Sequence, residues 1–364
     1  MIIRDITNYI EELAPLAYAE DFDNVGLLVG SYNTEVTGVL VTLDTLEQTV
    51  DEAIANNCNL IVSFHPIIFG GLKKLNGNNY VERTVLKAIQ NNIAIYATHT
   101  ALDNSNKGVS ARMCEVLQLQ NTKTLIPKKG IIKKLTTYVP YADANDLRQQ
   151  LFNAGAGTIG NYDLCSFNIE GKGSFRGNEH SNPTVGEKGA LQFEEETCIS
   201  VIFESYLEGK VLSALFKNHP YEEVSYEVIT LDNYHQNVGM GMIGEFPEAI
   251  AENDFLQFVK STFKTDCVRH SKLLSKPIKK VAVLGGAGSF AISNAIRAGA
   301  DAYVSADFKY HEFYKAENKI LLADVGHYES EQFTKNLLVE YLTKKFTSFA
   351  IILSEKSTNP IHYI

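Results

Sequence analysis

The stretch VTGVLVTLDTLEQTVDEAIANNCNLIVSFHP, residues Val36–Pro66, decides the fold class. It begins and ends with apolar, β-branched runs, Val36–Leu43 and Asn59–Phe64, which predict two buried strands. Between them, Thr45–Asn56 places its apolar residues at helical spacing, which predicts a helix joining the two strands. A strand, a helix and a second strand in this order are typical of a parallel sheet with helices packed on its faces.

The same alternation extends from this stretch in both directions and returns in the last third of the chain. Near the stretch, the sequence predicts a helix at Asp5–Ala14, a helix at Thr84–Gln90 and a strand at Ile93–Thr98. The last third predicts, in order, strand Lys280–Leu284, helix Ser289–Ala298, strand Ala302–Ala306, helix Phe308–Glu317, strand Ile320–Val325, helix Glu329–Lys345 and strand Phe349–Leu353. Both regions contain an apolar strand that ends in Val-Ser and a polar cluster, so we interpret them as a weak internal duplication.

The segment between about Lys128 and Asn237 has a different pattern. Its predicted elements are strand Leu135–Val139, helix Asp143–Asn153, strand Asp163–Asn168, a glycine-rich turn at Gly171–Gly177, strand Thr197–Phe203, helix Lys210–Lys217 and strand Tyr226–Leu231. The order β-α-β-β-α-β is typical of a ferredoxin-like domain. We therefore predict a split α/β core of parallel or mixed sheets with helices on both faces, residues 1–128 and 237–364, interrupted by an α+β insert at residues 129–236.

Length and composition exclude several classes of protein. A chain of 364 residues suggests two domains, or three, and 45% apolar with 21% charged residues is ordinary for a soluble globular protein. The net charge of −10 speaks against a surface that coats nucleic acid. No stretch approaches the ~20 apolar residues that span a bilayer, and the N-terminus has no signal-peptide pattern. Five scattered cysteines without a CxxC pair speak against a disulfide scaffold, so we expect a cytoplasmic protein without a membrane partner.

Histidines and carboxylates follow the predicted strands in four places. They are His65 in SFHP, His99 and Asp103 in HTALD, Asp307, His311 and Glu312 in DFKYHE, and His327, Glu329 and Glu331 in GHYESE. A single histidine at a strand end is more often a hydrogen-bonded cap than a ligand. However, the carboxyl ends of parallel strands meet at one edge of a sheet, so the four clusters are expected to converge.

The convergence predicts a divalent metal site. His327 and Glu331 are four residues apart, which places them on one face of a helix. Imidazole and carboxylate donors without cysteine favour zinc, iron or manganese. A carboxylate such as Asp103 or Glu331 can also bridge two cations ~3.5–4 Å apart.

The loop VLGGAGSFA, Val283–Ala291, allows two interpretations. Gly286 and Gly288 fit the loose dinucleotide pattern G-x-G-x-x-G/A, with Asp307 about 20 residues further on. A dinucleotide site at the Gly285–Gly288 loop leaves the other histidines and carboxylates unused. We favour a loop that presents backbone N–H groups and Ser289 to an anion beside a metal. The nucleophile-elbow and Walker patterns are absent, which speaks against a serine hydrolase and a P-loop NTPase.

Taken together, the motifs SFHPIIF, THTALD, GGAGS, SADFKYHE and DVGHYESE resemble the Nif-three-like dinuclear metal protein family, many of whose members are named GTP cyclohydrolase I type 2 homologues. The resemblance covers nearly the whole chain, and the glycine-rich and HPYEE segments of the middle resemble the insert of the family's longer form. It implies a PII-like insert and a toroidal homohexamer built as a trimer of dimers. The metal ligands it implies are His65, Asp103, His327 and Glu331.

One position departs from the family pattern. The family usually has two adjacent histidines before the proline, and here the first is Phe64. We therefore predict one or two ions per chain, with one site retained and the other weakened, or completed by water or by His99. The resemblance also implies that His99, Asp307 and His311 hydrogen-bond to the ligands or transfer protons.

The function implied by the family name is a metal-activated water that attacks a purine ring carbon. The same ligands permit phosphoester or amide hydrolysis, so we predict a metal-dependent hydrolase acting on a nucleotide-like or phosphorylated small molecule. The alternatives are a metal-binding or metallochaperone-like assembly without turnover and the dinucleotide-binding protein. The segment HPYEE, His219–Glu223, is equally consistent with a helix stop and with a function, and the insert is expected to cap the torus or sense a small ligand.

Overall fold

The computed structural model describes all residues from 1 to 364, which form two compact units. The first, called the core below, contains Met1–Pro127 and Asn237–Ile364. The second, called the insert, contains Lys128–Gln236. None of the helices combines the length and the apolar character needed to cross a membrane.

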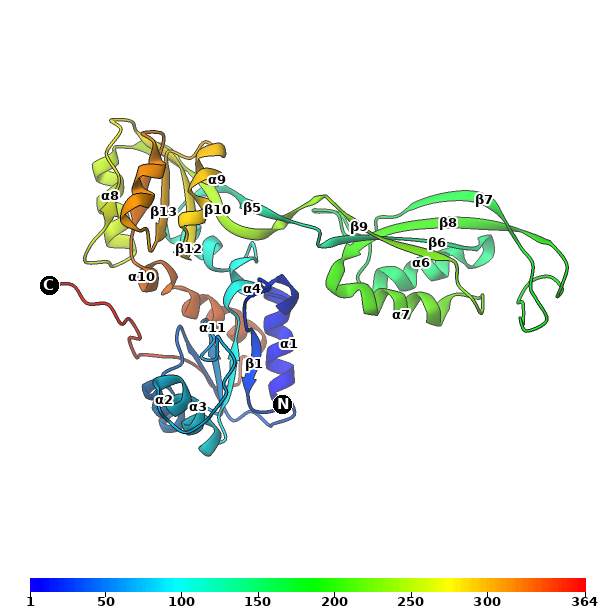
Figure 1. The fold of residues 1–364 in the computed structure, drawn as a ribbon, viewed down its shortest axis with the longest axis horizontal. Helices are drawn as coiled ribbons and strands as arrows, with labels where there is room; N and C mark the ends of the chain where they lie inside the picture. The colour runs from blue at the N-terminus through cyan, green and yellow to red at the C-terminus, as the bar shows by residue number, and fades with distance from the viewer. The chain divides into compact units, whose positions relative to one another are not determined.

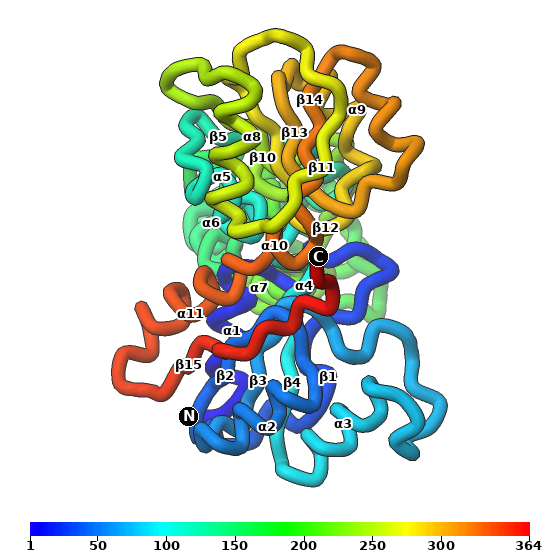
Figure 2. The backbone as a smooth tube through the Cα atoms, turned by 90° about the vertical axis from the view of Figure 1, so that its left-hand side faces the viewer, coloured from blue at the N-terminus to red at the C-terminus, as the bar shows by residue number.

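The first sheet of the core has five strands, four of them parallel (Figure 2). In spatial order they are β1 (Gly26–Val29), β4 (Ala94–Ala97), β3 (Leu60–Ser63), β2 (Val39–Thr42) and β15 (Ile351–Leu353), with β1 antiparallel to β4. Every residue of β2, β3 and β4 is buried, because helices cover both faces of the sheet.

Two pairs of helices cover this sheet. α2 (Glu47–Ala55) and α3 (Tyr80–Gln90) bury Val50, Val85 and Ala88 against one face. On the other face, α1 (Ile3–Leu13) and α11 (Thr334–Lys345) pack apolar residues spaced along the helix against the strands. In Figure 1, α1 lies on one side of this sheet, and α2 and α3 lie on the other.

The second sheet of the core has six strands with a parallel centre. In spatial order they are β11 (Arg269–His270), β14 (Leu321–Asp324), β13 (Ala302–Ala306), β12 (Ile278–Ala287), β10 (Tyr234–Ile250) and β5 (Gln120–Lys129). The strands β12, β13 and β14 are parallel, whereas β10 and β11 pair with them antiparallel. The helices α5 (Val109–Val116) and α8 (Glu252–Thr262) pack on one face, and α9 (Ile292–Arg297) packs on the other.

The insert forms a four-stranded antiparallel sheet with two helices on one face. Its elements are β6 (Ile132–Pro140), α6 (Ala144–Asn153), β7 (Phe167–Phe175), β8 (Gln192–Glu204), α7 (Glu208–Asn218) and β9 (Tyr226–Leu231). The spatial order β7-β8-β6-β9 and the chain order β-α-β-β-α-β together define the ferredoxin-like arrangement. The predicted fold class is therefore confirmed, whereas the closer likeness to PII proteins stays a prediction.

The insert departs from the sequence prediction around β7. The predicted strand Asp163–Asn168 is displaced and the predicted turn Gly171–Gly177 is wrong, because the observed strand begins at Phe167 and continues to Phe175. Glycine usually weakens a strand interior, but here a Cβ on Gly173 would lie 2.1 Å from the carboxylate of Glu196 on β8. Position 173 therefore requires glycine, because the Glu196 carboxylate occupies the space that a Cβ would fill.

The core departs from the prediction in its helices. The predicted helix Glu329–Lys345 is two helices, α10 (His327–Glu331) and α11. Between them, Phe333 packs on Phe263 in the core of the second sheet, whereas Leu338 and Leu342 of α11 are buried against the first sheet. The break allows the chain to pass from one sheet to the other.

The remaining helical elements are short. They are η1 (Leu16–Tyr18), α4 (His99–Asp103), η2 (Tyr141–Asp143), η3 (Ser205–Leu207), η4 (Ser289–Ala291) and η5 (Tyr310–Ala316). The 3₁₀ turn η4 thus begins the predicted helix Ser289–Ala298, and the 3₁₀ helix η5 replaces the predicted helix Phe308–Glu317.

Candidate metal centre

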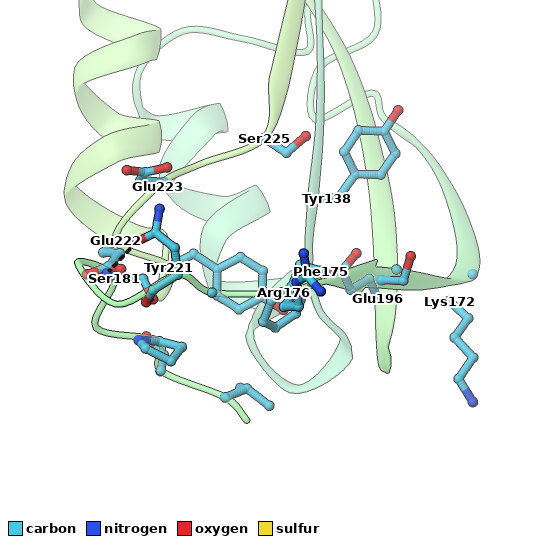
Figure 3. Close-up of a pocket in the computed structure, with 18 of the residues that line it drawn as sticks. Tyr138, Lys172, Phe175, Arg176, Ser181, Glu196, Tyr221, Glu222, Glu223 and Ser225 are labelled. Atoms are coloured by element: carbon cyan, nitrogen blue, oxygen red, sulfur yellow. Dashed lines mark hydrogen bonds between the residues drawn. The ribbon is translucent and has the colours of Figure 1, made fainter. Parts of the chain in front are cut away.

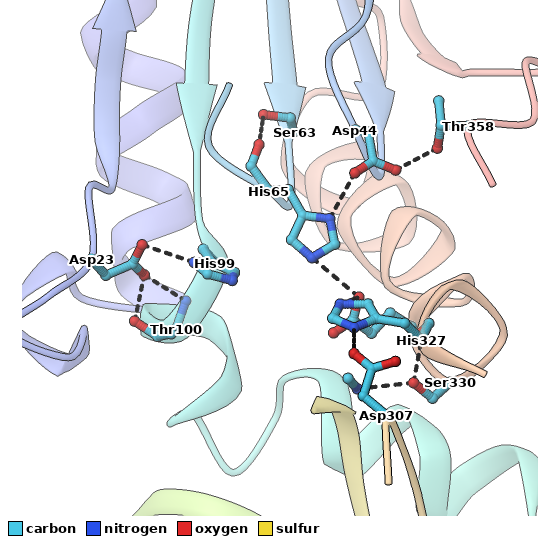
Figure 4. A network of polar contacts seen from close by, with 12 residues as sticks. Asp23, Asp44, Ser63, His65, His99, Thr100, Asp307, His327, Ser330 and Thr358 are labelled. Carbon is cyan, nitrogen blue, oxygen red and sulfur yellow. Dashed lines mark hydrogen bonds and ion pairs between the residues drawn. The ribbon is translucent and has the colours of Figure 1, made fainter. Parts of the chain in front are cut away.

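Three of the predicted site residues meet between the two sheets of the core (Figure 4). His65 follows β3, and His327 and Glu331 lie at the two ends of α10, which follows β14. One donor atom from each residue lies within 4.8 Å of the other two. The donors thus come from strand ends of both sheets, whereas the strand-end argument placed them at one edge of a single sheet.

Glu331 is the centre of this cluster. The Nε2 atoms of His65 and His327 lie 3.2 and 3.3 Å from its Oε2 atom, and the two imidazole rings are 5.5 Å apart between centroids. Oε2 is buried, yet neither approach has the geometry of a hydrogen bond. A buried carboxylate oxygen without a hydrogen bond is costly, and a cation held between the three donors would satisfy it.

Carboxylates hold the far side of both imidazole rings. Nδ1 of His65 lies 2.9 Å from Oδ1 of Asp44, and Nδ1 of His327 lies 2.8 Å from Oδ2 of Asp307. The hydroxyl of Thr358 donates to the other oxygen of Asp44 at 2.5 Å. When Nδ1–H donates to a carboxylate, Nε2 is left as the metal-binding atom, so this arrangement is the one found around metal-bound histidines.

The cluster is strongly coupled in charge. Burial alone would lower the pKa of His65 and of His327, but their carboxylate partners raise it well above the ordinary value. Burial would raise the pKa of Glu331, but the two imidazolium groups lower it. A metal cation at Nε2 would take the place of these protons, because a histidine binds metal only in its neutral form.

Asp103 lies beside the cluster at the end of α4. Burial, and next to it the charge of Glu331, raises the pKa of its carboxyl well above the ordinary value. The charges of His65 and His327 act on it in the opposite direction. Asp103 therefore interacts electrostatically with the cluster, although it is not one of the three donors that converge.

His99 is held at the edge of the same site. Its Nδ1 lies 2.8 Å from Oδ1 of Asp23, its ring centroid is 5.3 Å from that of His65, and its φ angle is 24°. Burial would raise the pKa of Asp23, but hydrogen bonds from His99 and Thr100 lower it to about 2. A positive φ at a residue other than glycine is strained, and such strain is concentrated at functional sites.

Phe64 occupies the place beside His65 with an apolar ring. The residue is fully buried, and its ring centroid lies 4.9 Å from that of His65 and 5.6 Å from that of His99. A phenyl ring supplies no electron pair to a cation. This position therefore contributes packing and no donor atom to the site.

The glycine loop lies directly against the cluster. A Cβ on Gly286, whose φ angle is +68°, would lie 2.4 Å from Oε1 of Glu331, and its N–H donates to Oγ of Ser330 at 2.9 Å. A Cβ on Gly288 would lie 2.0 Å from Oγ of Ser305. Close packing, of Gly286 against the cluster and of Gly288 against Ser305, therefore accounts for these glycines without a nucleotide.

Two predicted residues do not join the cluster. His311 is exposed on η5, where its ring packs on Tyr310 and Tyr314. Ser289 helps to lower the pKa of the Glu312 carboxyl, so a negative group lies near this hydroxyl, which speaks against an anion at this position. The role of both residues stays a prediction without a supporting contact.

Sequence reasoning missed three residues that support the histidines. Asp44 follows β2 in the same way as His65 follows β3, so its position after a strand is a signal that could have identified it. Asp23 precedes β1 in a loop, and Thr358 lies in the extended C-terminal segment. Neither has a periodic or motif signal, because their partners are distant in the sequence.

Known proteins resemble this chain in sequence and in fold. The family model Duf34/NIF3 (NGG1p interacting factor 3) matches residues 1–360. The chain belongs to the Duf34/NIF3 family. A relative from Bacillus subtilis, named GTP cyclohydrolase 1 type 2 homolog, is 36% identical over 371 residues, which cover 99% of this chain and 98% of the relative.

Solved structures of the family share the fold. A Bacillus cereus protein related to NIF3 is 36% identical, with a TM-score of 0.87 over 100% of this chain and 99% of the other. The Staphylococcus aureus protein SA1388 is 28% identical, with a TM-score of 0.80 over 100% of this chain and 99% of the other. Both similarities extend across the core and the insert.

Proposed function

We propose that this member of the Duf34/NIF3 family is a metal-dependent hydrolase. The observation that carries the proposal is the buried Oε2 of Glu331, which lacks a hydrogen bond and faces the Nε2 atoms of His65 and His327. Two nitrogens and one carboxylate oxygen are a common donor set for catalytic zinc and also suit iron and manganese.

The residues present suit one cation better than two. His65, His327 and Glu331 would hold it, with Asp103 as a further carboxylate. Phe64 stands where the family pattern has a histidine and offers no donor to a second ion. We therefore propose one tightly held ion per chain, with any second ion bound weakly through Asp103 and His99.

The chemistry follows from the donors and from His99. A cation of this class lowers the pKa of a bound water and so supplies a nucleophile at neutral pH. Asp23 fixes Nδ1 of His99, which leaves Nε2 available to take or return a proton beside the cluster. The name of the Bacillus subtilis relative supports a nucleotide-like or phosphorylated small molecule as substrate.

We also propose that the chain assembles into a toroidal homohexamer, built as a trimer of dimers. The core exposes large aromatic residues, with 73% of Tyr310, 66% of Tyr314 and 55% of Phe290 accessible in the single chain. Aromatic side chains gathered in this way are typical of interfaces between subunits. Light scattering on the purified protein tests the assembly, and a monomer at micromolar concentration would contradict it.

Elemental analysis combined with activity tests the metal-dependent reaction. Wild-type protein purified without added metal should carry close to one ion per chain, and Glu331→Gln should lose it. Glu340→Gln is the matched control, because Glu340 is an exposed carboxylate that pairs with Arg112 away from the site. Loaded wild-type protein should hydrolyse a member of a panel of nucleotides and phosphate esters, and Glu331→Gln should not. Retained metal in Glu331→Gln would contradict the site, and metal without turnover would leave a metal-binding assembly.

A further inference from the structure

The insert contains a large cavity that the metal centre does not use (Figure 3). Its volume is about 910 Å³, which is within the range of small-molecule sites. It is lined by β7, by the loop that follows β7, and by the HPYEE segment between α7 and β9. All of its lining residues belong to the insert.

A buried histidine fixes one wall of this cavity. Nε2 of His219 lies 3.0 Å from the backbone oxygen of Tyr138, and its Nδ1 accepts a hydrogen bond from the N–H of Tyr221 at 3.1 Å. Burial lowers the pKa of His219, which keeps the ring neutral and Nδ1 able to accept. His219 thereby holds the backbone of Tyr221 against β6.

Tyr221 in turn fixes a carboxylate. Its hydroxyl donates to Oε1 of Glu196 at 2.8 Å, and its ring lies 5.8 Å from the ring of Phe175 between centroids. The missing side chain of Gly173 leaves the space that the Glu196 carboxylate fills. Glu196 therefore presents a negative charge next to two aromatic rings, as Figure 3 shows.

The loop after β7 is fastened over the same wall. The N–H of Asn182 donates to Oε1 of Glu222 at 2.6 Å, and the hydroxyl of Thr184 donates to the backbone oxygen of Pro220 at 2.9 Å. Glu223 also lines the cavity and is exposed. Three carboxylates thus line a cavity whose shape is set by hydrogen bonds between distant segments.

The positive groups near the cavity do not neutralise these carboxylates. The ammonium of Lys172 lies 3.7 Å from Glu195, and Figure 3 shows its side chain directed away from the aromatic rings. Arg176 is exposed and forms no ion pair. The carboxylate of Glu196 therefore has a hydroxyl partner but no cationic one.

We propose that this cavity binds a small organic cation, an alkylammonium ion whose charge contacts Glu196. Its apolar stem would lie against Tyr221 and Phe175, since aromatic faces attract cations and cover methylene groups. The proposal is independent of the metal centre, because no residue of the cavity belongs to the core.

Calorimetric titration of the full-length protein with spermidine tests this site. The titration is done at about 0.15 M salt, where non-specific attraction to a chain of net charge −10 is largely screened. We expect saturable binding that Glu196→Gln weakens by about tenfold, because a charge-assisted hydrogen bond is lost while the shape is kept. Glu195→Gln is the matched control, since its side chain points to the opposite face of the sheet and should leave binding unchanged.

Four results would overturn the proposal. Binding too weak to saturate, or equal weakening in Glu195→Gln, would leave only diffuse attraction to an acidic surface. Displacement of spermidine by equimolar Mg²⁺ would indicate a simple cluster of carboxylates. Tighter binding of glutarate or inorganic phosphate, lost in Arg176→Gln, would assign the cavity to an anion.

Discussion

His65 and His327 direct their Nε2 atoms at the same buried oxygen of Glu331, although they follow strands of two different sheets. Each has its Nδ1 held by a carboxylate that follows the neighbouring strand of its own sheet, Asp44 after β2 and Asp307 after β13. Each sheet thus supplies one supported histidine to the cluster.

This relationship predicts that Asp44 sets metal affinity. The substitution Asp44→Asn should weaken binding of the first ion by about 10–100-fold, because the amide no longer fixes the proton on Nδ1 of His65. Competition with a metal-sensitive dye measures the affinity. Asp51→Asn is the control, since Asp51 is an exposed carboxylate paired with Lys87. Equal affinity in wild type and Asp44→Asn would show that the hydrogen bond does not orient the ring.

A second prediction concerns the glycine beside Glu331. Gly286→Ala should lower the free energy of unfolding by about 2–4 kcal/mol and should also lower the metal content. The reason is that a Cβ would lie 2.4 Å from Oε1 of Glu331 and that the φ angle is +68°. Gly299→Ala separates the two causes. Its φ angle is +73° but its Cβ would meet no atom within 4 Å, so it should cost only the backbone strain of about 1 kcal/mol and leave metal content unchanged. Similar losses in the two variants, by chemical denaturation, would refute the contact with Glu331.

The strands of this site could be predicted from the sequence, because buried parallel strands consist of continuous apolar runs. The runs LIVS and AYVS are recognisable as strands from their own composition. His65 and Asp307 each come two residues after such a run. It did not reach Asp23, whose link to His99 joins a loop before β1 to the end of β4. Such a contact depends on tertiary packing, which leaves no periodic trace along the chain.

The same limit explains the elements that were wrong. A glycine-rich segment indicates a turn by local propensity. In β7, however, the segment is a strand, and its Gly173 makes room for the side chain of Glu196 on the neighbouring strand. A helical period continued through Gln332 and Phe333, whereas burial of Phe333 against the second sheet ends the helix there. Local patterns predict an element, and the cores on either side decide where it ends.

A third prediction is that Asp23 contributes a defined part of the loss in the free energy of unfolding at acid pH. Asp23 has a pKa of about 2 in the folded protein against an ordinary value of 3.8, so the unfolded chain binds its proton first as the pH falls. Its contribution, about 2 kcal/mol at neutral pH, is therefore complete above pH 4 and is lost as the pH falls toward 2. Asp23→Asn should remove this part of the acid limb in denaturation curves measured between pH 2 and 7. Parallel curves for the two proteins would contradict it.

The last prediction addresses the buried phenyl ring of Phe64. Phe64→His should raise the metal content toward two ions per chain in protein incubated with excess zinc, because it restores a nitrogen donor next to His65 and His99. Without metal the same variant should be less stable by about 1–3 kcal/mol, since Phe64 is fully buried and an imidazole there lacks a partner. Phe64→Leu is the control, because it also opens space but adds no donor, and it should stay at the wild-type metal content. If Phe64→His also stays at the wild-type content, the second ion is limited by Asp103 and His99 and not by position 64.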